Sequence, residues 1–156
     1  MSVATHRAAL VALLNSVPDI GRVHEFQRYS REESVFRSLY IYDAPPMLPH
    51  LRGWQVSHTD QERRTLGIGR VLIKNAWTVR GYLVFNDEHR SELVFDALCE
   101  AIADVYQADP TLGGVCTAEM FGEGPDGVQK VGAGPVVFCG VLCNSAALQL
   151  ETWGYA

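Results

Sequence analysis

Residues 71–85, VLIKNAWTVRGYLVF, constrain the fold more than any other stretch of the sequence. Every second residue from Val71 to Phe85 belongs to a set that is apolar apart from Asn75, whereas the alternate positions include Lys74 and Arg80. This period of two predicts a β-strand with one dry face and one amphipathic face. At about 3.3 Å per residue the strand spans roughly 50 Å, more than twice the usual length.

Such a strand is long for the chain that contains it. The 156 residues fit a single domain over residues 1–156, whose expected radius of gyration is about 15 Å. One solution is a bulge or kink near Asn75 or Gly81 that folds the strand back onto its own sheet. The other is an overhang, whose free edges are covered by a neighbouring copy of the chain. The sequence leaves both open.

Composition restricts the function classes. With 47% hydrophobic and 20% charged residues, the chain can build a core without metal or disulfide staples. The net charge of −5 argues against a dedicated nucleic-acid binder, which needs a basic patch. No apolar run approaches eighteen residues and no signal segment opens the chain, so we expect synthesis in a cytoplasm without export and no membrane contact.

Helical periodicity marks three segments. Residues 3–15 and residues 91–106 are predicted as the two main helices, the second with Val94, Leu98, Ile102 and Val105 on its apolar face. Residues 31–39 are predicted as a short helix, with Ser30 and Glu33 as a capping box and with Val35, Phe36 and Leu39 turned inward.

Extended segments fill most of the remainder. We expect a strand at residues 21–29, and another from Gly53 that enters a charged hairpin loop, DQERRT at residues 60–65, and returns into the long strand. The last run, residues 136–153, is extended, with bends at Gly140 and at the Asn144–Ser145 pair. The predicted fold class is α+β, a mostly antiparallel sheet with two main helices packed on one face.

Glycine and proline dominate residues 108–135, which we expect to form a flexible loop or arm. Short strands around residues 114–120 and 128–131 are a further option, as a hairpin. Of the four cysteines, Cys116 lies in this segment and is the one expected to be exposed; the others are expected to be reduced and buried. Long connections of this kind are usually functional.

The sequence offers no reactive group. LGIGR at residues 66–70 lacks the third glycine of a dinucleotide fingerprint and precedes a strand, where the fingerprint opens a helix. No two of the five histidines lie within four positions of each other, and the cysteines form no C-x-x-C pair. We therefore predict no catalytic residue, no metal and no cofactor, and a protein that is not an enzyme.

The order of elements resembles that of a known family. An N-terminal helix, a strand with a short helix, a hairpin that ends in WTVRGYLVF, the helix FDALCEAIADVY, TLGG and a terminal GVLCNSAALQLETW are similar to the tail terminators and related tail-completion proteins of long-tailed bacteriophages. The resemblance covers residues 3–153. It implies an α+β subunit of the virion neck, assembled in the host cytoplasm, that forms a hexameric ring, caps the tail tube and offers a surface to the head connector.

By that resemblance function rests on interfaces. The glycine-rich segment 111–134 and a hairpin tip at residues 60–67 are the expected contacts with tube or neighbouring subunits. The interface residues are predicted to be the apolar anchors Met120 and Phe121 and the polar rim Arg63, Arg64 and Lys130. The resemblance further implies that DNA passes through the lumen of the ring without specific binding, because an acidic wall repels phosphates.

Two alternatives stay open. The same fold serves other neck or head–tail joining proteins. The second alternative belongs to a different class of protein: a small α+β enzyme or ligand-binding domain with a pocket between the sheet and the loop at residues 107–134.

Overall fold

The computed structural model describes residues 2–117 and 127–156. The helices are α1 (Val3–Asn15), α2 (Glu33–Ser38) and α3 (Ser91–Ala108). The strands are β1 (Arg22–His24), β2 (Ile41–Tyr42), β3 (His50–Gly67), β4 (Arg70–Val84), β5 (Gln129–Phe138) and β6 (Val141–Tyr155). The sheet order is β1-β3-β4-β6-β5, with β2 paired to β3, and only the β1–β3 pair is parallel. The predicted α+β fold with a mostly antiparallel sheet is confirmed.

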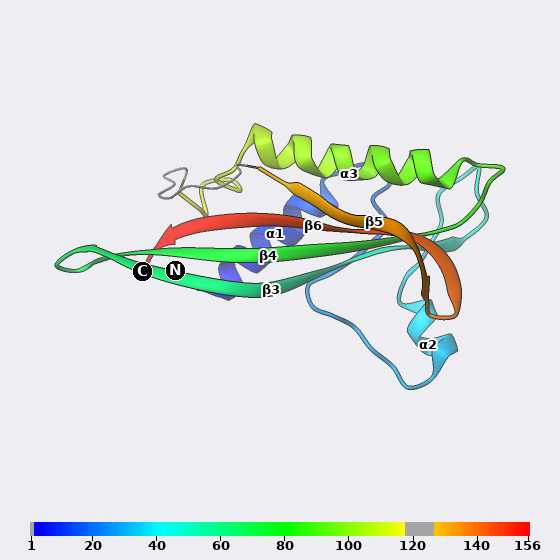
Figure 1. Cartoon of the computed structure of the whole chain (residues 1–156), viewed down its shortest axis with the longest axis horizontal. Coiled ribbons are helices and arrows are strands. Elements are labelled where there is room, and N and C mark those ends of the chain that lie inside the picture. Colours follow the sequence, from blue (N-terminus) through cyan, green and yellow to red (C-terminus); the bar gives the residue numbers. More distant parts are fainter. Residues whose placement is uncertain (1, 118–126) are drawn as a thin grey trace.

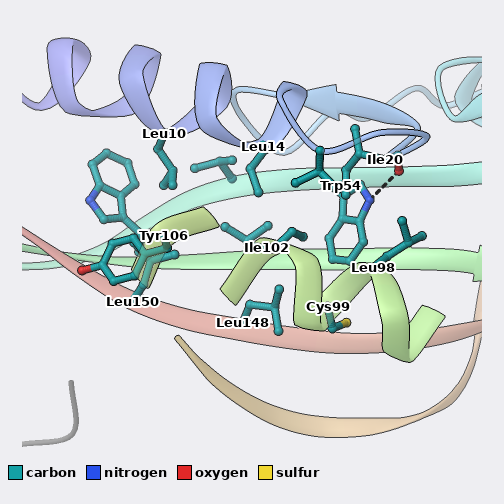
Figure 2. Close-up of a cluster of buried hydrophobic side chains, with 14 of the residues drawn as sticks. Leu10, Leu14, Ile20, Trp54, Leu98, Cys99, Ile102, Tyr106, Leu148 and Leu150 are labelled. Atoms are coloured by element: carbon teal, nitrogen blue, oxygen red, sulfur yellow. Dashed lines mark hydrogen bonds between the residues drawn. The ribbon is translucent and has the colours of Figure 1, made fainter. Parts of the chain in front are cut away.

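Both main helices pack on one face of the sheet (Figures 1 and 2). The helix α1 begins after Ser2, whose hydroxyl accepts a hydrogen bond from the Thr5 amide at 3.2 Å. Its buried side, Leu10 and Leu14, meets the core-facing residues of the central strands. These core-facing strand residues include Trp54, Val56, Trp77, Val79, Leu148 and Leu150. The dry face predicted for residues 71–85 therefore faces the main core at Trp77, Val79 and Leu83, whereas Phe85 at its end is 39% exposed.

The helix α3 is turned relative to the predicted face. Phe95 is 3% exposed and stacks on Trp54 with ring centroids 5.6 Å apart, whereas Val94 and Val105 are only half-buried. Aromatic stacking buries more area than either valine does. The prediction was wrong about the centre of the apolar face and right about Leu98 and Ile102.

A smaller core lies on the opposite face, at the end of the sheet near α2. Tyr82 stacks on Phe138 with centroids 3.7 Å apart, and Phe36 packs beside them. Val35 is 45% exposed, so its predicted inward position is wrong. The Ser30 hydroxyl accepts a hydrogen bond from the Glu32 amide but does not cap α2, which begins after Glu32. In the described part of the chain, no helix covers the remainder of this face, which we call the open face.

The strand β4 is long and unbroken. It pairs with β6 in continuous register from Leu72 to Val84, which excludes the alternative of a kink near Asn75 or Gly81. The irregularity is a bulge in the neighbouring strand, between His58 and Asp60. Gly81 has a packing role instead, because a Cβ atom there would lie 2.3 Å from the Trp54 ring.

The glycine-rich segment is shorter than predicted. Gln129 already begins β5, so the option of a strand around residues 128–131 is borne out, and β5 turns into β6 at Cys139 and Gly140, the latter at φ 73°. The turn at Gly140 is confirmed, whereas Asn144 lies within β6 and no bend forms there. Residues 114–117 form turns and a bend, and the rest of the predicted strand at 114–120 lies outside the described residues. The strand predicted over 21–29 is only Arg22–His24.

All four cysteines are free and buried. Cys116 is 5% exposed and packs in the main core, so the expectation that it is exposed is wrong. The turns that follow α3 bring Leu112 and Cys116 back onto the sheet, which a count of glycines does not reveal. No helix in the described part of the chain has the length and apolarity needed to cross a membrane.

Candidate interface site

The strands β3 and β4 end in a hairpin, residues 63–71, which we call the projecting hairpin because its outer part, from Thr65 to Arg70, extends beyond the other strands of the sheet. The strand β6 ends near Tyr155, which pairs with Leu72, while β3 and β4 continue alone to the Gly67–Arg70 pair. Figure 1 shows the projecting hairpin at the left, beyond the helices. A short overhang, one of the two solutions left open by the length of the strand, is thus present.

The turn of the projecting hairpin is not where the sequence placed it. Residues 60–65 belong to β3, and the chain reverses at Ile68 and Gly69, between the paired Gly67 and Arg70. Gly69 has φ 74°, a left-handed conformation that favours glycine. The charges of DQERRT suggested a loop, but an edge strand carries such charges because they discourage pairing with other chains.

The tip combines exposed apolar side chains with positive charge. Ile68 is fully exposed and Leu66 is 38% exposed. The projecting hairpin carries three arginines and no carboxylate, so the other residues of the chain have a net charge of −8. Among the described residues, no carboxylate lies within 4.0 Å of Arg63 or Arg70. The Arg70 guanidinium lies over the Tyr155 ring at 4.9 Å.

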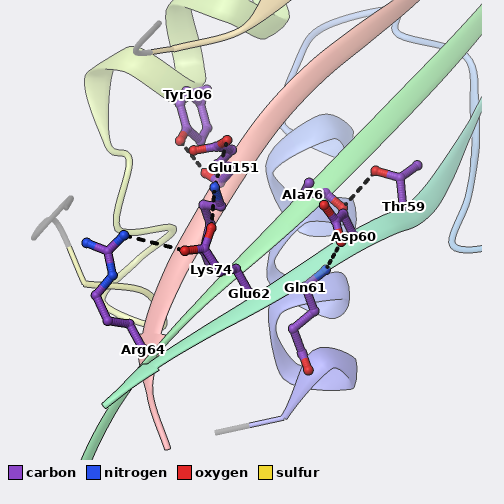
Figure 3. A network of polar contacts seen from close by, with 9 residues as sticks. All are labelled: Thr59, Asp60, Gln61, Glu62, Arg64, Lys74, Ala76, Tyr106 and Glu151. Atoms are coloured by element: carbon purple, nitrogen blue, oxygen red, sulfur yellow. Dashed lines mark hydrogen bonds and ion pairs between the residues drawn. The ribbon is translucent and has the colours of Figure 1, made fainter. Parts of the chain in front are cut away.

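Ion pairs and a bulge fix the root of the projecting hairpin (Figure 3). The Lys74 ammonium lies 2.9 Å from Glu62 and 3.8 Å from Glu151, and Arg64 lies 3.4 Å from Glu62. The hydrogen bond between Lys74 and Glu62 raises the pKa of the amine and lowers the pKa of the carboxyl group. At the bulge, the Thr59 hydroxyl donates to the Ala76 carbonyl at 3.2 Å. These contacts therefore hold β3 and β4 in a fixed arrangement where the projecting hairpin begins.

A buried polar network lies between α1 and the root. The Trp77 indole N–H donates to the Thr152 hydroxyl at 2.8 Å, and that hydroxyl donates to His6 Nδ1 at 2.8 Å. Asn75 Nδ2 also approaches His6 Nδ1, at 3.4 Å. Asn75 Oδ1 accepts from His58 Nε2 at 3.0 Å and from Gln61 Nε2 at 2.9 Å. Both donors that face His6 Nδ1 require that nitrogen to be unprotonated.

The network is suited to fixing α1 on the sheet rather than to chemistry. Burial lowers the pKa of His6, which keeps the ring neutral. His6 Nδ1 faces a threonine hydroxyl and an amide, and His58 Nε2 faces an amide, whereas a catalytic histidine is typically oriented by a carboxylate. In the described ranges, no group of three His, Cys, Asp or Glu side chains is arranged to hold a metal ion.

The predicted interface residues that the structure describes fall into two places. Arg63 and Arg64 are neighbours on the projecting hairpin, both exposed. Lys130 lies on β5 and contacts Asp96 of α3 at 2.7 Å, with its pKa raised by that hydrogen bond. Lys130 pairs with Leu148 of β6, whereas Arg63 lies at the level of Gly154 of β6, because both Arg63 and Gly154 pair with Ile73. The two levels are six residues apart along β6, which corresponds to roughly 20 Å along the strands. Met120 and Phe121 lie outside the described residues.

The open face carries a shallow polar hollow of about 480 Å³, lined by Gln27, Gln55, Ser57, Thr59, Thr78, Arg80 and Tyr82. Next to it, a second hollow of about 310 Å³ reaches Gly127 and Gln129, and so borders the segment where a ligand pocket was predicted. Ligand sites are usually apolar and enclosed. Both hollows are open and the first is mainly polar, so the projecting hairpin is the stronger candidate site.

Sequence reasoning missed Ile68 and the histidine network. A signal existed for each. Ile68 stands between two glycines, where a turn needs no apolar side chain, and Asn75 is the one polar residue on the dry face of its strand. The partners of Asn75, including Thr152, come from distant segments, so the contacts themselves required the fold.

No protein-family model matches the chain, and no curated protein matches it at a significant level.

Proposed function

We propose that this protein is a structural component of a long-tailed bacteriophage, a tail terminator that forms a hexameric ring and caps the tail tube. The observation that carries the proposal is the projecting hairpin, an exposed basic element with an apolar tip on a body of opposite charge. A monomeric protein has little use for an uncovered hairpin of this kind, because exposed apolar groups and free strand edges promote association.

The outer edge of β3 opposes strand pairing through its charges but leaves its side chains accessible to a partner. The strand β1 pairs only with Gly53–Gln55, so in the described part of the chain the outer edge of β3 has no neighbouring strand from Val56 onward. The element order that resembles the tail terminators, from the N-terminal helix to the long terminal strand, agrees with the element order of the fold. We propose further that the protein acts through shape and contacts and has no enzymatic activity, cofactor or metal.

The proposal assigns the partners of the ring. One side of the ring contacts the last layer of the tail tube, the other contacts a head connector protein, and DNA passes through the lumen without specific contacts. The negative charge of the body suits such a passage, because an acidic wall repels phosphates. The virion is then the site of action, after assembly in the host cytoplasm.

Tube capping tests the proposal. Tail-tube protein of the same virus is polymerised with and without the chain, and tube lengths are measured by electron microscopy with the chain labelled at its N-terminus. We expect shorter tubes with label at one end only. Label bound to purified connector and absent from tubes would favour another neck protein. Tubes and connectors that both remain free of label would contradict the proposal.

The second candidate is a small ligand-binding domain, which would hold a polar ligand in the hollow on the open face. A ligand that binds the folded state raises the melting temperature. A metabolite screen by thermal shift, with Arg80→Ala and Thr78→Ala as variants of the hollow, tests this candidate. Stabilisation by a ligand that is lost in both variants would support it.

A further inference from the structure

We propose that the projecting hairpin docks onto the exposed face of α3 in a second copy of this chain. The choice of a second copy as partner rests on the proposed function. The contact itself is argued from the two surfaces.

The projecting hairpin presents side chains that its own chain leaves uncovered. Ile68 makes the apolar tip with Leu66, and Arg63 and Arg70 have no carboxylate partner among the described residues. The hairpin points away from α3 in Figure 1. A contact between the two elements therefore requires another copy.

The exposed face of α3 has the complementary properties. Leu93 is 60% exposed and Ala97, one turn further, is also exposed, so the two make an apolar spot. Acidic residues recur at every fourth position around this spot, at Glu92, Asp96, Glu100 and Asp104, and α3 contains no lysine or arginine. Asp96 forms an ion pair with Lys130. In the described part of the chain, the other three carboxylates of α3 have no basic side chain within 4.0 Å.

The two surfaces agree in chemistry and in length. Ile68 and Leu66 match Leu93 and Ala97 as an apolar centre, and the hairpin arginines match the glutamates as a charged rim. A guanidinium binds a carboxylate through two parallel hydrogen bonds, which makes arginine the suitable donor at an interface. From Arg63 to Ile68 the hairpin extends about 17 Å, and the acidic row from Glu92 to Asp104 extends about 18 Å.

Side-chain docking explains these features better than pairing of strand edges does. The edge of β3 carries Asp60, Glu62 and Arg64 and a bulge, which are devices that oppose edge-to-edge pairing. The hairpin of one copy and the α3 of the next are different surfaces, so the contact is heterologous. Repetition of a heterologous contact gives a closed ring or an open filament.

Sedimentation equilibrium of the full chain tests the contact. The measurement is made at about 50 mM salt, where charges are weakly screened, and at chain concentrations up to about 1 mM, which detects even weak association. We expect Ile68→Asp to weaken self-association at least about tenfold, since an apolar anchor at the interface centre is lost. The matched control is Val137→Asp, because Val137 is 73% exposed and belongs to β5, outside both the projecting hairpin and α3, and it should leave association unchanged. Circular dichroism verifies that both variants are folded.

Charge reversal identifies the acceptor surface. Arg63→Glu with Arg70→Glu should weaken association, and so should Glu92→Arg with Glu100→Arg in a separate chain. An equimolar mixture of the two variants should associate again, because each then meets an opposite charge. Restored association in the mixture supports the contact and distinguishes α3 from any other acceptor.

Three results would overturn the inference. The first is a wild-type chain that stays monomeric throughout. The second is association that Ile68→Asp and Val137→Asp affect equally, which would leave the proposed ring standing but built on other surfaces. The third is a failure of the mixed charge variants to associate. Tube capping tests the proposed function separately, so a failure of one is distinguishable from a failure of the other.

Discussion

Replacing Trp77 with alanine should lower the free energy of unfolding by about 4–5 kcal/mol. The side chain is 1% exposed and lies between the His58 ring, at 4.9 Å between centroids, and the Arg7 guanidinium, at 5.4 Å. Truncation of a buried aromatic residue to alanine costs about 3–5 kcal/mol. The indole N–H also donates to Thr152, and loss of that bond adds about 1 kcal/mol, which places the total in the upper half of the range.

Urea denaturation and thermal denaturation, both followed by circular dichroism, measure this loss. For a chain of this length each 1 kcal/mol lowers the melting temperature by about 2–4 °C, so we expect a decrease of about 8–20 °C. The control is Leu48→Ala, since Leu48 is 85% exposed and its truncation should change stability by less than about 0.5 kcal/mol. A loss below about 1 kcal/mol for Trp77→Ala would refute the position of the indole in the core.

Three further predictions concern the core and its titration. Gly81→Ala should destabilise the protein by about 1–3 kcal/mol in the same assay, because the added Cβ meets the Trp54 ring, and an unchanged midpoint would contradict that contact. Burial lowers the pKa of His6, so the unfolded chain binds more protons. Stability should therefore fall as pH decreases below about 6.5, and His6→Gln should reduce this slope; an equal slope in the variant would assign the effect to other groups. All four thiols should react slowly with a disulfide reagent in the native state and rapidly in denaturant, because burial raises the pKa of Cys116, for example, to about 11; one fast thiol would show that a cysteine is exposed.

The sequence predicted the elements whose periodicity is long and regular. The helix at 3–15, the helix that begins at Ser91 and the strand from residue 71 all appear within two residues of their predicted positions. Each contains at least three full periods of its pattern, and a pattern of that length overrides local exceptions.

The predictions of elements were wrong where the local composition of a segment does not indicate its position in the tertiary structure. Residues 60–65 are charged because they occupy an exposed edge, and charge alone does not separate an edge strand from a loop. Cys116 follows several glycines but is buried by the turn that returns the chain to the sheet. The rotation of α3 depends on the stacking of Phe95 on Trp54, a contact between segments about forty residues apart that no local pattern contains.

The candidate site was predicted in part. A hairpin near residues 60–67 and the two arginines within it were expected, and the structure has an exposed hairpin there, with its turn shifted to Ile68 and Gly69. Lys130 was grouped with them by analogy, yet it neutralises Asp96 at a distant place on the sheet. Grouping residues into one surface requires strand order and register, and neither follows from a single sequence.

The central claim is that the protein functions by binding copies of itself and a tail tube. Electron cryomicroscopy of tail tubes assembled with this chain tests that claim most directly. The account predicts a ring of six chains at one end of each tube, with every projecting hairpin in contact with a neighbouring subunit. Tubes without a ring, together with isolated chains that hold a small molecule on the open face of the sheet, would contradict it.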